Sequence, residues 1–255
     1  MKTLLLTIFV LLTACQTIST ANAPHNLDEQ QAQNYFNSYK YQEASDAFLE
    51  LAKKSGQDIY ILKAADSAKL ARNCKRALEL YEEIEPKFIE AKEGKLACFL
   101  QDSNFHDAEM VGKKLLAIDA TRWKTLNALG VISALAGKGK EAIDYFKLAL
   151  ELIDKDQYIV QNNMALAFAL QDKLKESIKL LEGLDENEIK QNHQKIIAMN
   201  LSLFYGLDGQ LYKANEILSK YLTTEEVDAN LAYYTSLTSN KKDKERYIAG
   251  KLLGK

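Results

Sequence analysis

The sequence has few residues that break helices. Its 255 residues include 2 prolines and 11 glycines, whereas alanine, leucine, lysine and glutamate are frequent. Scarce helix breakers and abundant helix formers predict an all-α protein whose helices are joined by short turns. Hydrophobic residues make up 47% of the chain and charged residues 27%. This composition is typical of a globular protein that buries a substantial core.

Histidine and cysteine are also scarce, with 3 of each. His25, His106 and His193 stand alone, and there is neither an HExxH motif nor paired cysteine spacing. Neighbouring residues therefore cannot assemble a zinc site or a histidine-assisted nucleophile. We expect no catalytic residue, metal, cofactor or small-molecule substrate. The net charge of −2, without a long basic run before the C-terminus, also argues against nucleic-acid binding.

The N-terminus has the organisation of an export signal. Lys2 precedes an apolar run from Leu4 to Leu12, and small residues follow before Cys15. The run is shorter than the roughly 20 apolar residues that span a bilayer. We therefore predict a signal peptide over residues 1–14. Residues 15–26 are small and polar, which favours a flexible tether.

The end of this signal resembles the lipobox of bacterial lipoproteins, with the sequence Leu12-Thr13-Ala14-Cys15. The resemblance implies cleavage before Cys15 and attachment of lipid to its thiol. Gln16 stands where Asp commonly marks retention at the inner membrane. We therefore expect a lipid-anchored protein of the outer membrane that faces the periplasm. The alternative is an ordinary secretory signal followed by a chance cysteine.

Small residues recur along residues 27–222 at intervals of 33, 31, 34, 35 and 37 residues, at Ala44, Ala77, Ala108, Ala142, Ser177 and Ala214. These intervals scatter around the 34-residue period of tetratricopeptide repeats. The copy from Trp123 to Leu150 resembles the consensus of that repeat most closely. In it, Gly130 and Ala142 would let two helices approach, while Phe146 would fill the gap toward the next pair.

The repeats predict a right-handed superhelical solenoid of about six helix pairs over residues 27–222. A solenoid must cover the exposed face of its last repeat, and residues 223–238 are predicted to form the capping helix. Residues 239–255 contain six basic and two acidic side chains, a local charge of +4. They are interpreted as a solvated tail, or alternatively as a contact with an acidic partner or anionic lipid head groups.

Two segments carry a more specific resemblance, residues 161–170 (QNNMALAFAL) and residues 227–234 (VDANLAYY). They resemble the TadD family of tetratricopeptide lipoproteins from tight-adherence (Tad/Flp) pilus systems, in which the lipobox also fits. The resemblance implies a role in pilus assembly, with the outer-membrane secretin or another assembly component as the protein partner. The alternative is a scaffold of another envelope assembly or secretion machine.

The first helix of each pair lines the concave face of such a solenoid. In the last three repeats this face is predicted to form an apolar protein-binding groove from Asn127, Val131, Leu135, Asn162, Leu166, Leu170, Leu203 and Leu207. Earlier repeats contribute Gln33, Phe36, Asn37, Asp66, Lys69 and Leu70. An apolar groove suits an amphipathic helix. Alternatively, the strip is core between helices, or the chain's own C-terminal helix covers it.

Polar side chains beside this strip suggest how a ligand would be held. Asn163 and Asn200 are expected to bond to backbone groups, whereas Asn127 and Asn162 would read the main chain of a bound peptide. Because the strip is predicted to be exposed, Asp at Leu166 and at Leu203 should abolish partner capture and leave the fold intact.

Cys74 and Cys98 lie in adjacent repeats. Buried free thiols are one interpretation of this pair. A disulfide is the other, since the periplasm is oxidising, and it requires Cα atoms within about 7 Å of each other.

Overall fold

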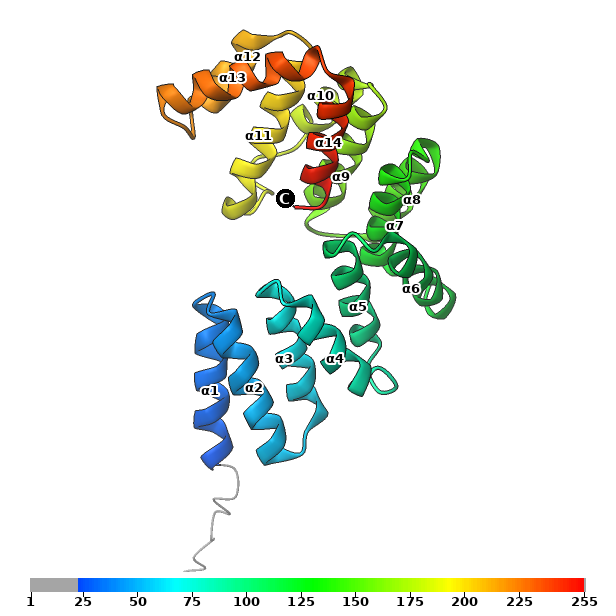
Figure 1. Cartoon of the computed structure of the whole chain (residues 1–255), viewed down its shortest axis with the longest axis vertical. Coiled ribbons are helices and arrows are strands. Elements are labelled where there is room, and N and C mark those ends of the chain that lie inside the picture. Colours follow the sequence, from blue (N-terminus) through cyan, green and yellow to red (C-terminus); the bar gives the residue numbers. More distant parts are fainter. Residues whose placement is uncertain (1–22, 255) are drawn as a thin grey trace, which may run out of the picture.

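The computed structural model describes residues 23–254, so the predicted signal peptide and Cys15 lie outside the described residues. Within this range the chain forms fourteen α-helices and no β-strand (Figure 1), which confirms the all-α prediction. The first twelve helices form six pairs: α1 (Ala23–Asn37) with α2 (Tyr41–Ser55), α3 (Asp58–Leu70) with α4 (Cys74–Ile84), α5 (Ile89–Gln101) with α6 (Phe105–Ile118), α7 (Trp123–Leu135) with α8 (Gly139–Leu152), α9 (Gln157–Leu170) with α10 (Leu174–Glu182), and α11 (Gln191–Leu207) with α12 (Leu211–Leu218). The last four residues of the predicted tether thus belong to α1.

The six turns within these pairs share one conformation. Each has three residues, and the middle one has a positive φ of 60–80°: Tyr39, Arg72, Ser103, Gly137, Asp172 and Gly209. The amide of the next residue donates to the carbonyl five residues earlier, as Lys138 does to Ser133 at 2.8 Å. This is the Schellman termination of a helix. A positive φ is costly for residues other than glycine, so packing of the pair stabilises the turn at the other four positions.

The predicted register of the repeats agrees with these turns. Each of the six small residues lies five positions after the positive-φ residue of its own turn, and each is fully buried. A small side chain on the second helix lets it approach the first helix closely. Phe146, which was expected to fill the gap toward the next pair, lies against Gly130 of its own pair. The spacing of the small residues therefore marked the close contacts within the pairs.

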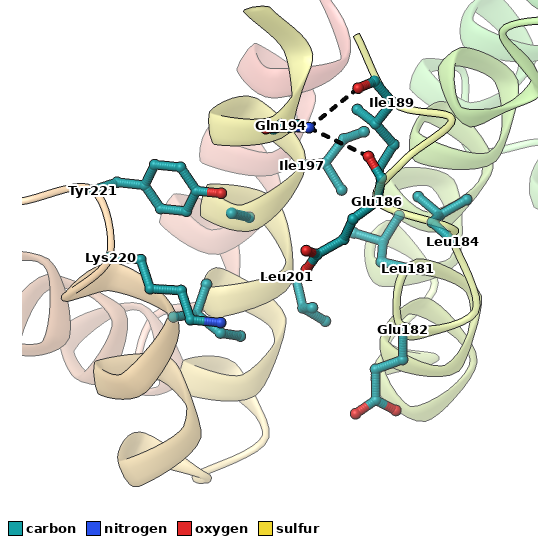
Figure 2. Close-up of a pocket in the computed structure, with 12 residues that line it drawn as sticks. Leu181, Glu182, Leu184, Glu186, Ile189, Gln194, Ile197, Leu201, Lys220 and Tyr221 are labelled. Atoms are coloured by element: carbon teal, nitrogen blue, oxygen red, sulfur yellow. Dashed lines mark hydrogen bonds between the residues drawn. The ribbon is translucent and has the colours of Figure 1, made fainter. Parts of the chain in front are cut away.

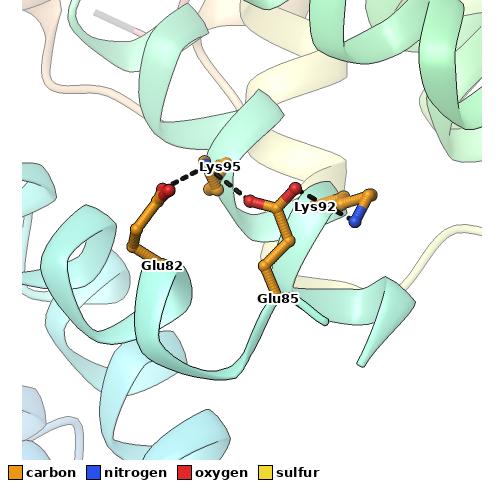
Figure 3. A network of polar contacts seen from close by, with 4 residues as sticks. All are labelled: Glu82, Glu85, Lys92 and Lys95. Atoms are coloured by element: carbon orange, nitrogen blue, oxygen red, sulfur yellow. Dashed lines mark hydrogen bonds and ion pairs between the residues drawn. The ribbon is translucent and has the colours of Figure 1, made fainter. Parts of the chain in front are cut away.

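The core runs along the stack of pairs and is supplemented by polar contacts between them. One network joins α4 to α5, where Lys95 pairs with both Glu82 and Glu85, and Lys92 pairs with Glu85 at 3.0 Å (Figure 3). The hydrogen bond from Lys95 and the neighbouring charges lower the pKa of Glu85. The carboxylate of Glu85 therefore stays charged and holds the second and third pairs together.

The C-terminal region has two helices, α13 (Thr224–Thr238) and α14 (Lys241–Leu252). The first corresponds to the predicted capping helix, since it packs on α11 and α12. Thr223 and Glu226 form a reciprocal capping box at its start. The second corrects the expectation of a solvated tail, because Ile248 and Leu252 are buried. The net charge of the segment did not reveal this docked helix, because its few apolar residues are interspersed among basic ones.

Candidate binding groove

A groove follows the first helices of the pairs, from α1 through α9. Adjoining cavities mark its course, including one of about 350 Å³ between α3, α5 and α7 and one of about 380 Å³ between α7, α9 and α14. The part along α1, α3, α5 and the start of α7 is called the open groove, and its lining includes Gln33, Phe36, Lys63, Asp66, Lys69, Glu90, Glu93, Ala97, Lys124 and Thr125. The part beneath α14 is called the covered groove. Its lining includes Ala134, Leu135, Leu170, Glu245 and Ala249.

Charged side chains in the open groove are held by neighbouring helices. Asp66 accepts hydrogen bonds from the Tyr81 hydroxyl at 2.6 Å and from Lys69 Nζ at 2.7 Å. Glu93 accepts one from Arg122 at 2.6 Å. Burial and the nearby Asp66 carboxylate raise the pKa of Tyr81, so Tyr81 remains a neutral donor. The groove thus presents fixed positive and negative charges to a ligand.

Thr125 lies in the wall of the open groove with its hydroxyl buried. Its side chain lines the 350 Å³ cavity and is buried, yet its hydroxyl has no hydrogen-bond partner among the described residues. Burying a hydroxyl without a partner is unfavourable. Ala97 and Ala128 line the same cavity with small side chains. These small side chains leave room for a ligand segment, whereas the buried Thr125 hydroxyl is not accessible to it.

Most of the apolar residues predicted for the groove are core residues. Leu166 and Leu203 are 0% and 1% exposed, and Val131 and Leu207 are also buried. All four belong to one continuous hydrophobic cluster. The expectation that Asp at Leu166 and Leu203 would spare the fold is therefore corrected. Periodicity did not distinguish the groove surface from the core, because residues of both kinds lie next to each other along the same helices.

Leu135 and Leu170 differ from these core residues because they are half-buried and border α14. Lys244 of α14 pairs with Asp172 in the turn after α9, and Arg72 donates a hydrogen bond to the Gly254 carbonyl at 3.1 Å. The chain's own C-terminal helix thus lies over this part of the strip. Protein binding through the predicted residues remains a prediction, and it requires α14 to move.

Asparagine side chains connect the first helices to each other. Asn163 donates to Asn127 at 3.1 Å, and Asn200 donates to Asn162 at 2.8 Å. Asn163 and Asn200 were expected to bond to backbone groups, so this detail is corrected. The paired asparagines are 36 and 38 residues apart, close to one repeat, and this spacing is the feature of the sequence that indicates side-by-side positions on neighbouring first helices. Asn127 also borders a cavity beside Leu252 and Leu253, where a peptide main chain could reach it.

Solved structures with the same arrangement of helices show the fold. A tetratricopeptide repeat protein from Parabacteroides merdae matches with a TM-score of 0.66 and 15% identity, over 85% of this chain and 87% of its own. The chain has the tetratricopeptide-repeat fold. A chain of the APC/C hetero-tetramer Cut9–Hcn1 matches with a TM-score of 0.68 and 15% identity. The match covers 90% of the present chain and 44% of the Cut9–Hcn1 chain. No model of a known protein family and no curated protein matches the sequence.

A separate cavity of about 130 Å³ lies between α10, α11 and α12 of the tetratricopeptide array (Figure 2). Ile189, Ile197 and Leu201 supply apolar side chains to it, and Gln194 Nε2 donates to the carbonyls of Glu186 and Ile189, both at 3.3 Å. These bonds fix the loop after α10 against α11. The cavity is therefore a packing feature of a long inter-repeat loop.

The described part of the chain offers no cluster of metal ligands and no exposed thiol. No group of three or more histidine, cysteine, aspartate or glutamate side chains is placed there to hold a metal ion. Cys74 and Cys98 are free and buried, and burial raises the pKa of both thiols. None of the helices from α1 to α14 is long and apolar enough to cross a membrane.

Proposed function

We propose that this protein is a non-catalytic scaffold that binds a segment of a protein partner along its concave groove. The observation that carries the proposal is the open groove, where cavities continue from α1 to α7 and no residue of α13 or α14 lines them. Paired charges at Asp66 and Glu93 and the small side chains of Ala97 and Ala128 give it polar and apolar contact points. Such a mixture fits a peptide segment, since helical repeats bind along their concave surfaces.

Two exposed alanines allow a matched test of this groove. Ala97 on α5 lines the 350 Å³ cavity of the open groove and the cavity beside Leu252, whereas Ala117 on α6, the second helix of the same pair, lines neither. Ala97→Trp should fill the groove and lower the amount of captured partner, because the indole occupies the space of the ligand. Ala117→Trp should capture as much as the unmodified protein. Equal capture by both variants would argue against the groove.

The finer proposal is a lipid-anchored scaffold of the outer membrane that helps the secretin of a Tad/Flp pilus to localise or assemble. It is supported by the lipobox ending at Cys15 and by the resemblance of residues 161–170 and 227–234 to the TadD family. The structural likenesses concern the fold alone. The alternative is a lipoprotein scaffold of another envelope machine.

Two measurements test the finer proposal. Cys15→Ala should release the protein from membranes, because several acyl chains anchor durably at ~0.8 kcal/mol per buried CH₂. Unchanged fractionation would exclude the lipid anchor. Affinity capture from membranes should recover the secretin. Recovery of outer-membrane barrel-assembly proteins without the secretin would favour the alternative machine.

A further inference from the structure

Helix α14 departs from the repeat pattern. The six regular pairs have three-residue turns with a positive φ, whereas α13 and α14 are joined by only Ser239 and Asn240, with φ of −89° and −131°. Without the positive-φ residue the chain does not reverse into a regular pair. Helix α14 packs more extensively on α9 than on α13, on the inner side of the array (Figure 1).

One face of α14 makes these contacts. Lys244, Ile248 and Leu252 are spaced four residues apart, so they lie on one side of the helix. Lys244 is only 17% exposed and pairs with Asp172, while Ile248 and Leu252 join the main hydrophobic cluster. Beyond the helix, the Gly254 carbonyl accepts a hydrogen bond from Arg72. The contact therefore consists of a cation, two aliphatic side chains and a carbonyl acceptor.

Helix α14 is held by fewer buried side chains than the helices beneath it. Two of its twelve residues are buried, compared with seven of fourteen in α9. It also contains Gly250 in its last turn, where glycine is less favourable than alanine. Segments with few buried apolar contacts open locally at lower free energy than the core. Opening of α14 would uncover Leu135 and Leu170 and would free the exposed carboxylate of Asp172 from its ion pair with Lys244.

We propose that α14 is an internal occupant of the covered groove, and that a partner helix of the same chemistry displaces it. The partner segment is a short amphipathic helix with a basic side chain followed at four and eight residues by aliphatic ones. Its cation replaces Lys244 at Asp172, and its aliphatic side chains replace Ile248 and Leu252. This inference rests on the proposed function and adds the class of ligand and a way to regulate access.

The test measures binding of a fluorescent peptide with the sequence of residues 240–254 to the full chain. The double variant Ile248→Asp with Leu252→Asp should release α14 from the groove. The dissociation constant of the peptide should then fall about tenfold or more, because most molecules have an unoccupied groove. The control is the double variant Thr238→Asp with Ser239→Asp, which adds the same charge outside the contact between α14 and the groove. It should bind the peptide like the unmodified chain. Equal affinity of the released and control variants would overturn the proposal.

Two further variants separate groove binding from other effects. Gly250→Ala should raise the dissociation constant, since it stabilises α14 and a Cβ atom there meets no atom within 4 Å. In the released variant, Asp172→Lys should weaken peptide binding about tenfold, because the cation of the peptide loses its partner. Unchanged affinity in the Asp172 variant would place the peptide elsewhere and overturn the proposal.

Hydrogen exchange of the unmodified chain keeps the proposal falsifiable if a variant fails to fold. The amides of α14 should exchange about tenfold or more faster than those of α11. Protection of α14 equal to that of α11 would overturn the inference. The outcome is distinct from that of the groove test, since a chain that captures its partner through Ala97 but keeps α14 fixed retains the proposed function.

Discussion

The Phe146 ring lies so close to Gly130 that a Cβ atom on residue 130 would be 2.7 Å from it. This contact sets the approach of α7 and α8 in the fourth pair. Gly130→Ala should therefore lower the free energy of unfolding by about 1–3 kcal/mol, as overpacking of a core does. Urea unfolding followed by circular dichroism measures the change. Gly250→Ala, where the added atom meets open space, should instead stabilise by about 0.5–1 kcal/mol. A stable Gly130 variant would show that Phe146 can move aside.

Leu166 is fully buried, so its side chain contributes to stability before any role in binding. Leu166→Ala should cost about 2–5 kcal/mol, and Leu166→Asp should cost more because an unpaired carboxylate would be buried. Leu148→Asp on α8 is the control, since Leu148 is exposed. Thermal unfolding should show a much lower Tm only for the Leu166 variants. If the Leu166→Asp protein folds with an unchanged Tm, Leu166 is exposed, as predicted from the sequence for the apolar groove.

Tyr205 makes stability depend on alkaline pH. Burial and a hydrogen bond to Glu182 raise the pKa of Tyr205 to about 12, whereas an unfolded tyrosine ionises near ~10. The folded state holds this proton more tightly, so the stabilisation is complete below about pH 10 and is lost as pH rises to about 12. Urea midpoints should fall across this window. The fall should be smaller in Tyr205→Phe and unchanged in Tyr212→Phe, an exposed tyrosine.

Cys74 and Cys98 should react slowly in the folded protein. Both thiols are buried, and burial raises the pKa of each, which depletes the reactive thiolate. In the chain from Gln16 onward, iodoacetamide should modify them about tenfold or more slowly than in denaturant. Mass spectrometry gives the rates. Rapid labelling, or a mobility shift on reduction, would contradict buried free thiols.

The repeat pattern was determined by the sequence itself. Small residues from Ala44 to Ala214 set the period because only a small side chain permits close contact of paired helices. The expectation of a capping helix after the last repeat followed from that period. Local constraints of this kind depend on residue size and spacing alone, so they can be predicted without knowing how distant segments meet.

Tertiary structure decided which surfaces are available. Leu166 and Leu135 both lie on the predicted inner side of first helices, yet one is core and the other borders α14. The pairing of Asn163 with Asn127, and of Lys244 with Asp172 from 72 residues away, depends on the curvature of the whole array. A short basic segment carries too few apolar residues to reveal its docking site. Its place in the groove was fixed by the shape and charge that the stacked helices present.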